Sequence, residues 1–184
     1  MIDAVVKVGG ALLDDHNTLS RTLSALEIVA PARALVIVPG GGPFADVVRA
    51  VDQRHALSSD DAHWMAILGM EQFAIALASR IRNAELVHGS DDIARAQTRG
   101  RIPVLAPYRW LRESDPLPHS WDVTSDSIAA WIASEIGARQ IILIKPDAHD
   151  ALTVVDRYFD RARAPSLKYS IVTPTMLTGN WYPG

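Results

Sequence analysis

Short apolar runs recur along the chain, and segments with helical periodicity follow most of them. Runs rich in β-branched and aliphatic residues predict buried strands at 4–8, 34–38, 84–87, 102–106, 140–144 and 169–172. Between them, apolar residues spaced by three and four predict helices, such as one from Asn17 or Thr18 to about Val29. Strands that alternate with helices are typical of a mostly parallel sheet with helices on both faces. We therefore expect an α/β fold of that kind.

The helix predicted from Asp60 to about Arg82 is unusual because its apolar residues cover most of its circumference. A helix that is apolar nearly all round is normally buried on both sides. We expect one side to pack on the sheet and the other on a second copy of the chain. The sequence therefore predicts a homodimer through this helix, and a larger assembly of such dimers stays open. His63 lies on the helix and is expected to be structural rather than a ligand.

Composition narrows the class of protein. With 184 residues, of which 48% are hydrophobic and 21% charged, the chain suits one globular domain with a large core. The formal net charge is −3 and no long basic run occurs, so a nucleic acid is not expected as a partner. The absence of cysteine excludes disulfides and thiolate metal sites. No apolar run approaches the roughly 20 residues of a membrane helix and the N-terminus does not resemble a signal peptide, so a soluble cytoplasmic protein is expected.

Two turns that follow predicted strands are rich in glycine. Lys7 lies near the end of the first strand and precedes Gly9 and Gly10. A lysine at the carboxyl end of a strand would point into the crevice where open α/β sheets bind ligands, although an edge strand would leave it in solvent. After the second strand, glycines at 40–42 allow backbone amides to approach a ligand, whereas a tight turn alone needs fewer. We expect both turns to face one crevice.

The segment 117–133 passes from a proline-rich loop into a helix. Ser, Thr and Asp residues at 122–127 precede an apolar periodic run, which marks a helix N-terminus. Two carboxylates, Asp122 and Asp126, lie four residues apart at this start. They suit either a simple helix cap or a site for a polyanion with its metal ion.

Basic residues follow two further predicted strands. Lys145 ends the strand at 140–144, at the same level of the sheet as Lys7. Arg109 and Arg112 lie in a segment at 108–112 that we expect to be extended over the mouth of the crevice. These arginines could bind an anionic substrate, with a solvated loop as the alternative.

Five pieces of the chain together resemble a known family. They are Lys7-Val-Gly-Gly10, Val38-Pro-Gly-Gly-Gly-Pro43, the long apolar helix, Asp122-Val-Thr-Ser-Asp-Ser-Ile-Ala-Ala130 and Ile141-Ile-Leu-Ile-Lys145. Over residues 3–147 their order resembles the amino acid kinase family, which includes the acetylglutamate, carbamate, aspartate and uridylate kinases. The sequence at 120–127 is most similar to one branch of that family. That branch phosphorylates an aminomethyl-furanmethanol phosphate in the synthesis of methanofuran-type cofactors.

The resemblance implies a three-layer α/β/α sandwich that transfers the γ-phosphoryl group of ATP, with Mg²⁺, to a carboxylate, carbamate or phosphate. It implies a single domain over 1–184, with about 1–138 binding the acceptor and dimerising and about 139–184 forming a shortened nucleotide-binding part. The implied catalytic residues are Lys7, Asp126 and Lys145, with Asp126 orienting the lysines. The implied nucleotide contacts are Gly9, Gly10, Ser125 and Lys145. The implied acceptor contacts are Gly40, Gly41, Gly42, Asp122, Thr124 and Arg109, and no protein ligand for a metal ion is implied.

The chain departs from the family pattern after residue 144. Relatives usually continue with Thr-Asp-Val-Asp-Gly, whereas this chain reads Lys145-Pro-Asp-Ala-His-Asp150. The second catalytic lysine of the family commonly lies further along, so both Lys145 and Lys168 stay open as its match. These departures leave open a non-catalytic protein that binds a nucleotide or anion on the same fold. The small size leaves open a uridylate-type kinase.

Overall fold

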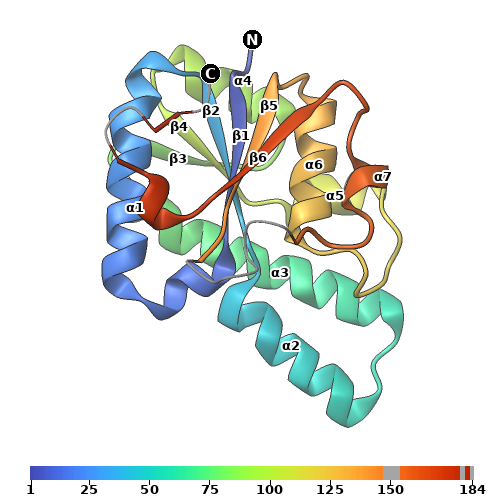
Figure 1. Ribbon diagram of the computed structural model, residues 1–184. Helices are drawn as coiled ribbons and strands as arrows, with labels where there is room; N and C mark the ends of the chain where they lie inside the picture. Colours follow the sequence, from blue (N-terminus) through green and yellow to red (C-terminus); the bar gives the residue numbers. More distant parts are fainter. Residues whose placement is uncertain (147–153, 179–180, 183–184) are drawn as a thin grey trace.

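The computed structural model describes residues 1–146, 154–178 and 181–182, so most of the unusual segment 145–150 and the last two residues lie outside the described residues. In the described part, six strands form one sheet in the order β3-β4-β2-β1-β5-β6, and every neighbouring pair is parallel. The strands are β1 Ala4–Val8, β2 Leu35–Pro39, β3 Ala84–Val87, β4 Ile102–Leu105, β5 Gln140–Ile144 and β6 Lys168–Val172. The predicted parallel sheet is therefore confirmed (Figure 1).

Helices cover both faces of this sheet. They are α1 His16–Val29, α2 Gly42–His55, α3 Ser59–Ala78, α4 Ser90–Thr98, α5 Tyr108–Ser114, α6 Ser125–Glu135 and α7 Phe159–Ala162. In Figure 1, α1 lies on one side of the sheet and α5, α6 and α7 lie on the other, which confirms the three-layer α/β/α arrangement. None of the helices in the described residues combines the length and the apolar character that a membrane-spanning segment requires.

Successive residues of the central strands face two separate core clusters. In β1, Val5 belongs to the cluster that contains the apolar residues of α6, whereas Val6 belongs to the cluster that contains those of α1. This alternation follows from the two-residue period of a strand. Lys7 shares the parity of Val5, and Lys145 shares that of Leu143, which also belongs to the α6 cluster. The two-residue period of the strands therefore places both lysine side chains on the side of the sheet that α6 covers.

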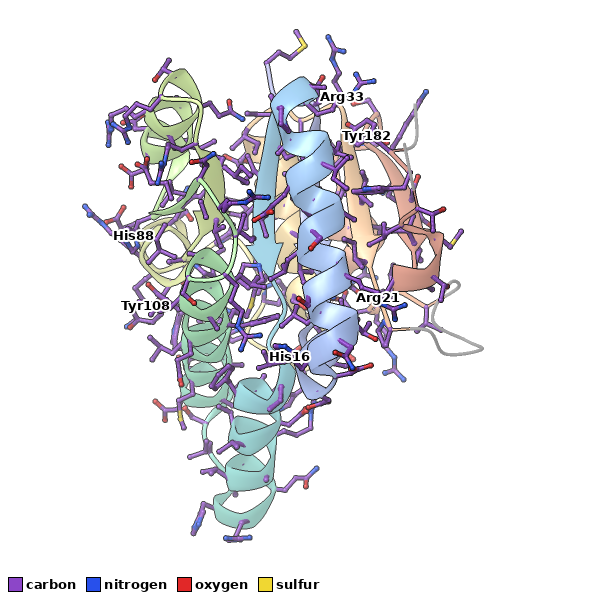
Figure 2. All side chains as sticks on the ribbon, turned by 90° about the vertical axis from the view of Figure 1, so that its left-hand side faces the viewer. His16, Arg21, Arg33, His88, Tyr108 and Tyr182 are labelled. Atoms are coloured by element: carbon purple, nitrogen blue, oxygen red, sulfur yellow. The ribbon has the colours of Figure 1, made fainter. Side chains whose placement is uncertain are left out.

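Helices α2 and α3 extend together beyond the carboxyl end of the sheet (Figures 1 and 2). Near the middle of α3, Ile67 and Met70 belong to the cluster on the α6 side. The second half of α3 contributes Phe73 and Leu77 to the cluster on the α1 side. Helix α3 thus packs into the core on both sides of the sheet, whereas α2 projects beyond the end of the sheet.

The end of the chain returns to the amino end of the sheet beside α1. The indole N–H of Trp181 donates to Ala25 O at 3.1 Å. The guanidinium of Arg33 lies 4.9 Å from the centroid of the Tyr182 ring, and Figure 2 shows these two side chains together. These contacts keep the described C-terminal residues away from the carboxyl ends of the strands.

The segment at 108–112 is helical, so the prediction of an extended piece was wrong. It forms the first part of α5, in which Leu111 is buried against the α6-side core and Arg109 stays exposed. A window of five residues with one buried position is too short to separate a helical period from a strand period. Tertiary packing of Leu111 decides the structure here.

Two helix boundaries also differ from the predictions. Helix α1 is capped by Asp15, whose carboxylate accepts the N–H groups of Asn17 at 2.9 Å and Thr18 at 3.3 Å. The predicted caps, Asn17 and Thr18, are therefore the residues that Asp15 caps. Helix α3 ends at Ala78 rather than near Arg82.

The two glycine turns touch each other at the carboxyl end of the sheet. A Cβ atom on Gly10 would lie 2.0 Å from the amide nitrogen of Gly42, and one on Gly40 would lie 2.4 Å from the amide nitrogen of Gly10. Backbone atoms cannot rotate aside as the end of a long side chain can. The glycines are therefore required for the turns after β1 and β2 to meet.

We expect Gly10→Ala to lower the free energy of unfolding by about 3 kcal/mol or more, because overpacking usually costs about 1–3 kcal/mol and here the clash is with backbone. Urea unfolding would measure the loss as a lower midpoint with an unchanged slope. Gly89→Ala is the matched control, since a Cβ there meets nothing within 4 Å and φ is −179°. The control should lose less than about 1 kcal/mol. Equal losses in the two variants would contradict this explanation of Gly10.

Candidate active site

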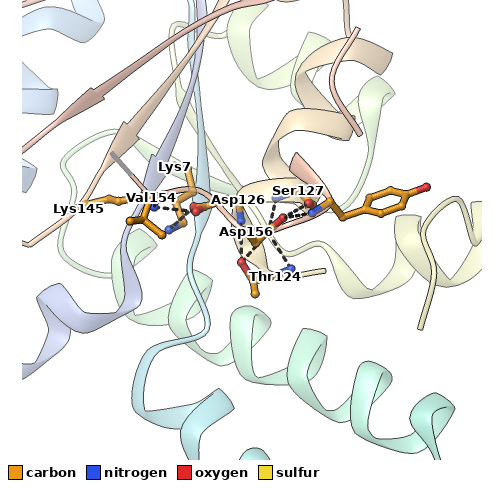
Figure 3. Close-up of polar contacts among 8 residues, drawn as sticks. Lys7, Thr124, Asp126, Ser127, Lys145, Val154 and Asp156 are labelled. Atoms are coloured by element: carbon orange, nitrogen blue, oxygen red, sulfur yellow. Dashed lines mark hydrogen bonds and ion pairs between the residues drawn. The ribbon is translucent and has the colours of Figure 1, made fainter. Parts of the chain in front are cut away.

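A buried carboxylate lies between two lysines at the carboxyl end of the sheet. Lys7 Nζ is 2.8 Å from Asp126 Oδ1, and Lys145 Nζ is 2.8 Å from Asp126 Oδ2 (Figure 3). Only 6% of Lys7 and 5% of Asp126 is exposed. Lys145 also donates to the carbonyl oxygen of Val154. The fold thus brings together the three residues predicted to be catalytic, which we call the lysine–aspartate triad.

Three elements position the triad. Lys7 lies in β1 opposite Leu143 of the parallel neighbour β5. Lys145 comes two residues after Leu143, directly after the end of β5 and on the same side. Asp126 is in the first turn of α6. Lys168 begins β6 opposite Gln140, at the amino edge of the sheet. Geometry therefore favours Lys145 over Lys168 as the second lysine of the site.

The triad carries an excess of positive charge. Burial alone would raise the pKa of Asp126, but the ammonium of Lys7, with the hydrogen bond and charge of Lys145, outweighs burial and holds that pKa below its ordinary value. Two ammonium groups and one carboxylate leave a net charge of +1. A buried excess charge is costly unless a counter-ion neutralises it, so the triad is suited to bind an anion.

A second carboxylate, Asp156, holds the start of α6. It accepts the backbone N–H groups of Thr124 and Ser127 at 2.9 Å each, the Thr124 hydroxyl at 2.7 Å, and the Ser127 hydroxyl (Figure 3). It also accepts the N–H of Tyr158 at 3.1 Å. A carboxylate at a helix start satisfies N–H groups and complements the helix dipole. Asp156 therefore fixes the turn that presents Asp126.

The role of Asp156 could not be predicted from the sequence. The residue lies 32 positions after Thr124, in a stretch without clear periodicity. A cap supplied from so far along the chain leaves no local pattern. The local cap, in which the Thr124 hydroxyl accepts the N–H of Asp126 at 3.4 Å, is the one that the Ser/Thr/Asp pattern predicts.

Four of the five glycines predicted to contact a ligand divide into two groups, and the fifth, Gly10, packs against Gly42. Gly9 donates its N–H to Ile144 O, and Gly40 donates to Val8 O, at 2.8 Å each. Both N–H groups are engaged within the end of the sheet, so the geometry does not support their predicted contacts with a ligand. Gly41 and Gly42 instead line a cavity at the N-terminus of α2, and a helix N-terminus favours anions.

This cavity, of about 380 Å³, lies between α2, α3 and the loop that leads into α6. Its size suits a small molecule. Ile67 and Met70 of α3 form an apolar part of its wall. Thr124 and Ser125 line it next to Asp126, so the cavity lies beside the triad. Four of the residues predicted to bind a ligand thus lie on one cavity wall: Gly41, Gly42, Thr124 and Ser125.

Two predicted acceptor contacts lie elsewhere. Arg109 is on α5, where its Nε is 3.0 Å from Glu113 Oε1. Asp122 is exposed and lies 3.4 Å from a guanidinium nitrogen of Arg157. Neither belongs to the described residues that line the cavity. Their contact with an acceptor stays a prediction without support from the geometry.

The α2 side of the cavity carries polar residues that the sequence did not single out. The indole N–H of Trp121 donates to Asp52 Oδ2 at 2.7 Å. The guanidinium of Arg49 lies 4.6 Å from the centroid of the Trp121 ring and 3.2 Å from Asp46 Oδ1. On a helix wheel Asp46, Arg49 and Asp52 look like an ordinary solvated face, so only the folded chain shows that they line a cavity together with Trp121.

His63 of α3 also lines the cavity, and it stacks on His119 with ring centroids 4.2 Å apart and planes at 19°. The two nitrogens of His119 lie 2.7 Å from Asp60 Oδ1 and 2.8 Å from Asp115 Oδ1. Burial, with the nearby charge of His119, lowers the pKa of His63 to about 4. The hydrogen bond to Asp60 raises the pKa of His119 above 6.5. His63 is therefore an uncharged ring at neutral pH, and its structural role stays a prediction.

The sequence matches a known family over most of its length. The model of the amino acid kinase family covers residues 4–148. The chain belongs to the amino acid kinase family. This finding confirms the resemblance that the five motifs predict.

One curated relative of this amino acid kinase is the (5-(aminomethyl)furan-3-yl)methyl phosphate kinase of Methanocaldococcus jannaschii, which is 33% identical over 141 residues. The aligned part is 76% of this chain and 63% of that protein. The chain therefore spans less than two thirds of the length of this relative.

Solved structures of uridylate kinases share the fold of this amino acid kinase. The uridylate kinase of Archaeoglobus fulgidus gives a TM-score of 0.71 at 16% identity, over 95% of this chain and 92% of that chain. The UMP kinase of Ureaplasma parvum gives 0.64 at 18% identity, over 80% and 67%. At sequence identities this low, the structural similarity shows a shared fold and nothing about the activity of this chain.

The histidine pair makes stability depend on pH in a predictable direction. Because the pKa of His119 is raised, its charged contacts stabilise the folded state at low pH, and the stabilisation is lost as pH rises through that pKa. We expect His119→Gln to lower the free energy of unfolding by about 1 kcal/mol near pH 6 and by clearly less near pH 9. Urea unfolding at both pH values would measure this difference.

The matched control is His16→Gln, an exposed position at the start of α1, which should change stability little at either pH. In proton NMR, the pKa of His63 should rise in the His119 variant, because a neighbouring positive charge is removed. A loss of stability that is equal at the two pH values would contradict the assignment of charge to His119.

Proposed function

We propose that this amino acid kinase transfers the γ-phosphoryl group of ATP to the phosphate of a small acceptor, preferably (5-(aminomethyl)furan-3-yl)methyl phosphate, to form a pyrophosphate. The observation that carries the proposal is the lysine–aspartate triad, whose excess positive charge lies beside a cavity for a small molecule. The name of the relative from M. jannaschii supports the choice of acceptor. Since the chain spans only 63% of that relative, the reaction needs its own test.

Phosphoryl transfer asks the protein for position and charge rather than for covalent chemistry. An acceptor phosphate oxygen forms a bond to the γ-phosphorus, and the bond from that phosphorus to the β–γ bridging oxygen breaks, so ADP leaves with the electron pair. A phosphate acceptor is already an anion and needs no strong general base. Lys7 and Lys145 would donate to the oxygens of the moving phosphoryl group. Asp126 would act as a positioning residue, because it fixes both ammonium groups.

The chemistry of the triad fits a nucleotide with magnesium. The net positive charge of two lysines and one aspartate favours the polyphosphate of ATP. In the part of the chain that the structure describes, no group of three or more His, Asp or Glu side chains is placed to hold a metal ion. Magnesium would then be held mainly by phosphate oxygens and water, as is usual where it accompanies a nucleotide. The division into an acceptor part at 1–138 and a nucleotide part at 139–184 belongs to the same proposal.

We also propose that two copies associate through the outer face of α3. Leu68 is 42% exposed and Ile75 is 56% exposed, and they lie two helical turns apart on the side that faces away from the sheet. Large apolar residues grouped on one exposed face are typical of a contact between proteins. This arrangement supports the homodimer that the apolar circumference of the helix predicts.

The kinase proposal is tested by ADP formation from ATP and Mg²⁺ with a panel of acceptors. The panel contains (5-(aminomethyl)furan-3-yl)methyl phosphate, UMP, N-acetylglutamate, aspartate and carbamate. Turnover is expected on the furan phosphate. Lys7→Ala and Lys145→Ala should each lower kcat by about 100-fold or more, because each removes a charge from the transition state. Urea unfolding of each variant would show whether it is folded.

Lys168→Ala is the matched control, since this lysine is exposed at the opposite edge of the sheet, and it should keep kcat within about threefold of the wild type. Bound ATP without turnover on any acceptor would overturn the kinase proposal in favour of a non-catalytic binding protein. Turnover on UMP in place of the furan phosphate would identify a uridylate-type kinase.

The dimer proposal is tested by light scattering after size-exclusion chromatography. Ile75→Glu places a charge in the proposed contact and should halve the molar mass of the particle. Ile28→Glu changes an even more exposed isoleucine on α1 and should leave the mass unchanged. A wild-type chain that runs as a monomer, or an Ile75→Glu variant that stays a dimer, would contradict the proposal.

A further inference from the structure

The cavity beside the triad has ends of opposite charge. Its first end contains the N-terminus of α2 and Ser125, whose chain neighbour Asp126 belongs to the positively charged triad. The wall along α2 contains Asp46, Arg49 and Asp52, which are two carboxylates and one guanidinium. A molecule that fits this cavity should therefore carry an anion at its first end and a cation along α2.

The two carboxylates of this wall are not equivalent. The side chain of Asp46 is 70% exposed and is neutralised by Arg49 at 3.2 Å. Asp52 is partly buried, and the indole N–H of Trp121 holds its Oδ2 at 2.7 Å. A carboxylate can accept about four hydrogen bonds, so Asp52 keeps capacity for another donor. A fixed and partly desolvated carboxylate attracts a cation more strongly than a mobile exposed one.

We propose that Asp52 determines the acceptor specificity by binding a positively charged amine at the end of the cavity opposite the reacting phosphate. Trp121 acts as the positioning residue that orients the carboxylate. The inference rests on the proposed function, because it requires the acceptor phosphate to lie at the triad. It defines the substrate class as small phosphate esters that carry an ammonium group at their other end.

The chain keeps the Asp52 wall close to the start of α6. Trp121 lies three residues before Thr124, so their Cα atoms are at most about 11 Å apart. Asp52 contacts the side chain of Trp121, and Thr124 lines the cavity at the start of α6. A furan ring with an aminomethyl group on one side and a methyl phosphate on the other has a matching order of charges.

Asp52 also acts against other acceptors of this family. UMP offers a neutral base and ribose, so the carboxylate would lose water without gaining a charge partner. N-acetylglutamate would place a second carboxylate in a wall that already has more acid than base. The same residue would thus favour an amine and disfavour neutral or anionic groups.

Isothermal titration calorimetry without nucleotide tests this inference on the whole chain. The two ligands are (5-(aminomethyl)furan-3-yl)methyl phosphate and the analogue with a hydroxymethyl group in place of the aminomethyl group. The wild type should bind the amine about tenfold more tightly or better, as expected for a charge-assisted hydrogen bond. Asp52→Asn retains an oxygen for the Trp121 N–H and removes only the charge, so the two ligands should then bind within about threefold of each other.

Asp46→Asn is the comparison variant, because it removes an exposed carboxylate from the same wall, and it should keep the preference for the amine. If Asp52→Asn does not fold, Trp121→Phe, which keeps a ring but removes the N–H, should weaken the preference. The inference is overturned if the wild type shows no preference or binds neither ligand. It is also overturned if Asp52→Asn keeps the preference, or if Asp46→Asn loses it.

The assay of ADP formation separates this inference from the proposed function. An amine preference that depends on Asp52, without any ADP formation, would retain the binding role and reject the kinase. ADP formation with equal KM values for the two ligands would retain the kinase and reject the role of Asp52. If both hold, Asp52→Asn should raise KM for the amine about tenfold and change kcat little, because the contact is remote from the transferred group.

Discussion

The site depends on one interaction, the carboxylate of Asp126 held between the ammonium groups of Lys7 and Lys145 at 2.8 Å each. Removing these charges from water costs several kcal/mol per ion, and only close contact between opposite charges offsets that cost. One carboxylate cannot neutralise two lysines, so the triad keeps a net positive charge unless an anion binds. The proposed polyphosphate would neutralise it, and the lysines that would bind this anion are already oriented by Asp126.

This interaction places strict demands on the fold. β1 and β5 must be parallel neighbours so that their carboxyl ends lie at one edge, and the two-residue period must direct both lysines toward α6. Helix α6 must begin at that edge, and Asp156 fixes its first turn through the N–H and hydroxyl groups of Thr124 and Ser127. The glycine turns then bring the start of α2 against Gly10. Each element limits the movement of a charged group, which is how a protein preorganises a site.

The sequence predicts the parts of this arrangement that have a local or periodic origin. The strands follow from apolar runs, the face of Lys7 from its parity with Val5, and the helix start at Asp126 from a run of capping residues. Contacts between distant segments have no such pattern, so Asp156 was missed. α5 was mistaken for an extended piece because its period is visible over only two turns.

The ligand contacts, too, could not be predicted reliably from local sequence patterns. Gly9 and Gly40 match a phosphate-binding pattern, yet their N–H groups are bonded within the end of the sheet. A glycine required for close backbone approach and a glycine required for a ligand look identical in a sequence. The link between Trp121 and Asp52 was equally hidden, since 69 residues separate them.

The residues proposed for catalysis and for acceptor specificity lie on helices that are buried to very different extents. α6 buries seven of its eleven residues, Asp126 among them, so changes there would disturb both packing and the triad. α2 buries only Val48 of its fourteen residues, although Asp52 lies on it. Substitutions in α2 should therefore cost little stability, whereas substitutions in α6 at the carboxyl edge of the sheet should cost more. A fold of this kind can therefore keep the edge of its sheet while the wall of its cavity changes, which agrees with the architecture that it shares with uridylate kinases at 16–18% identity.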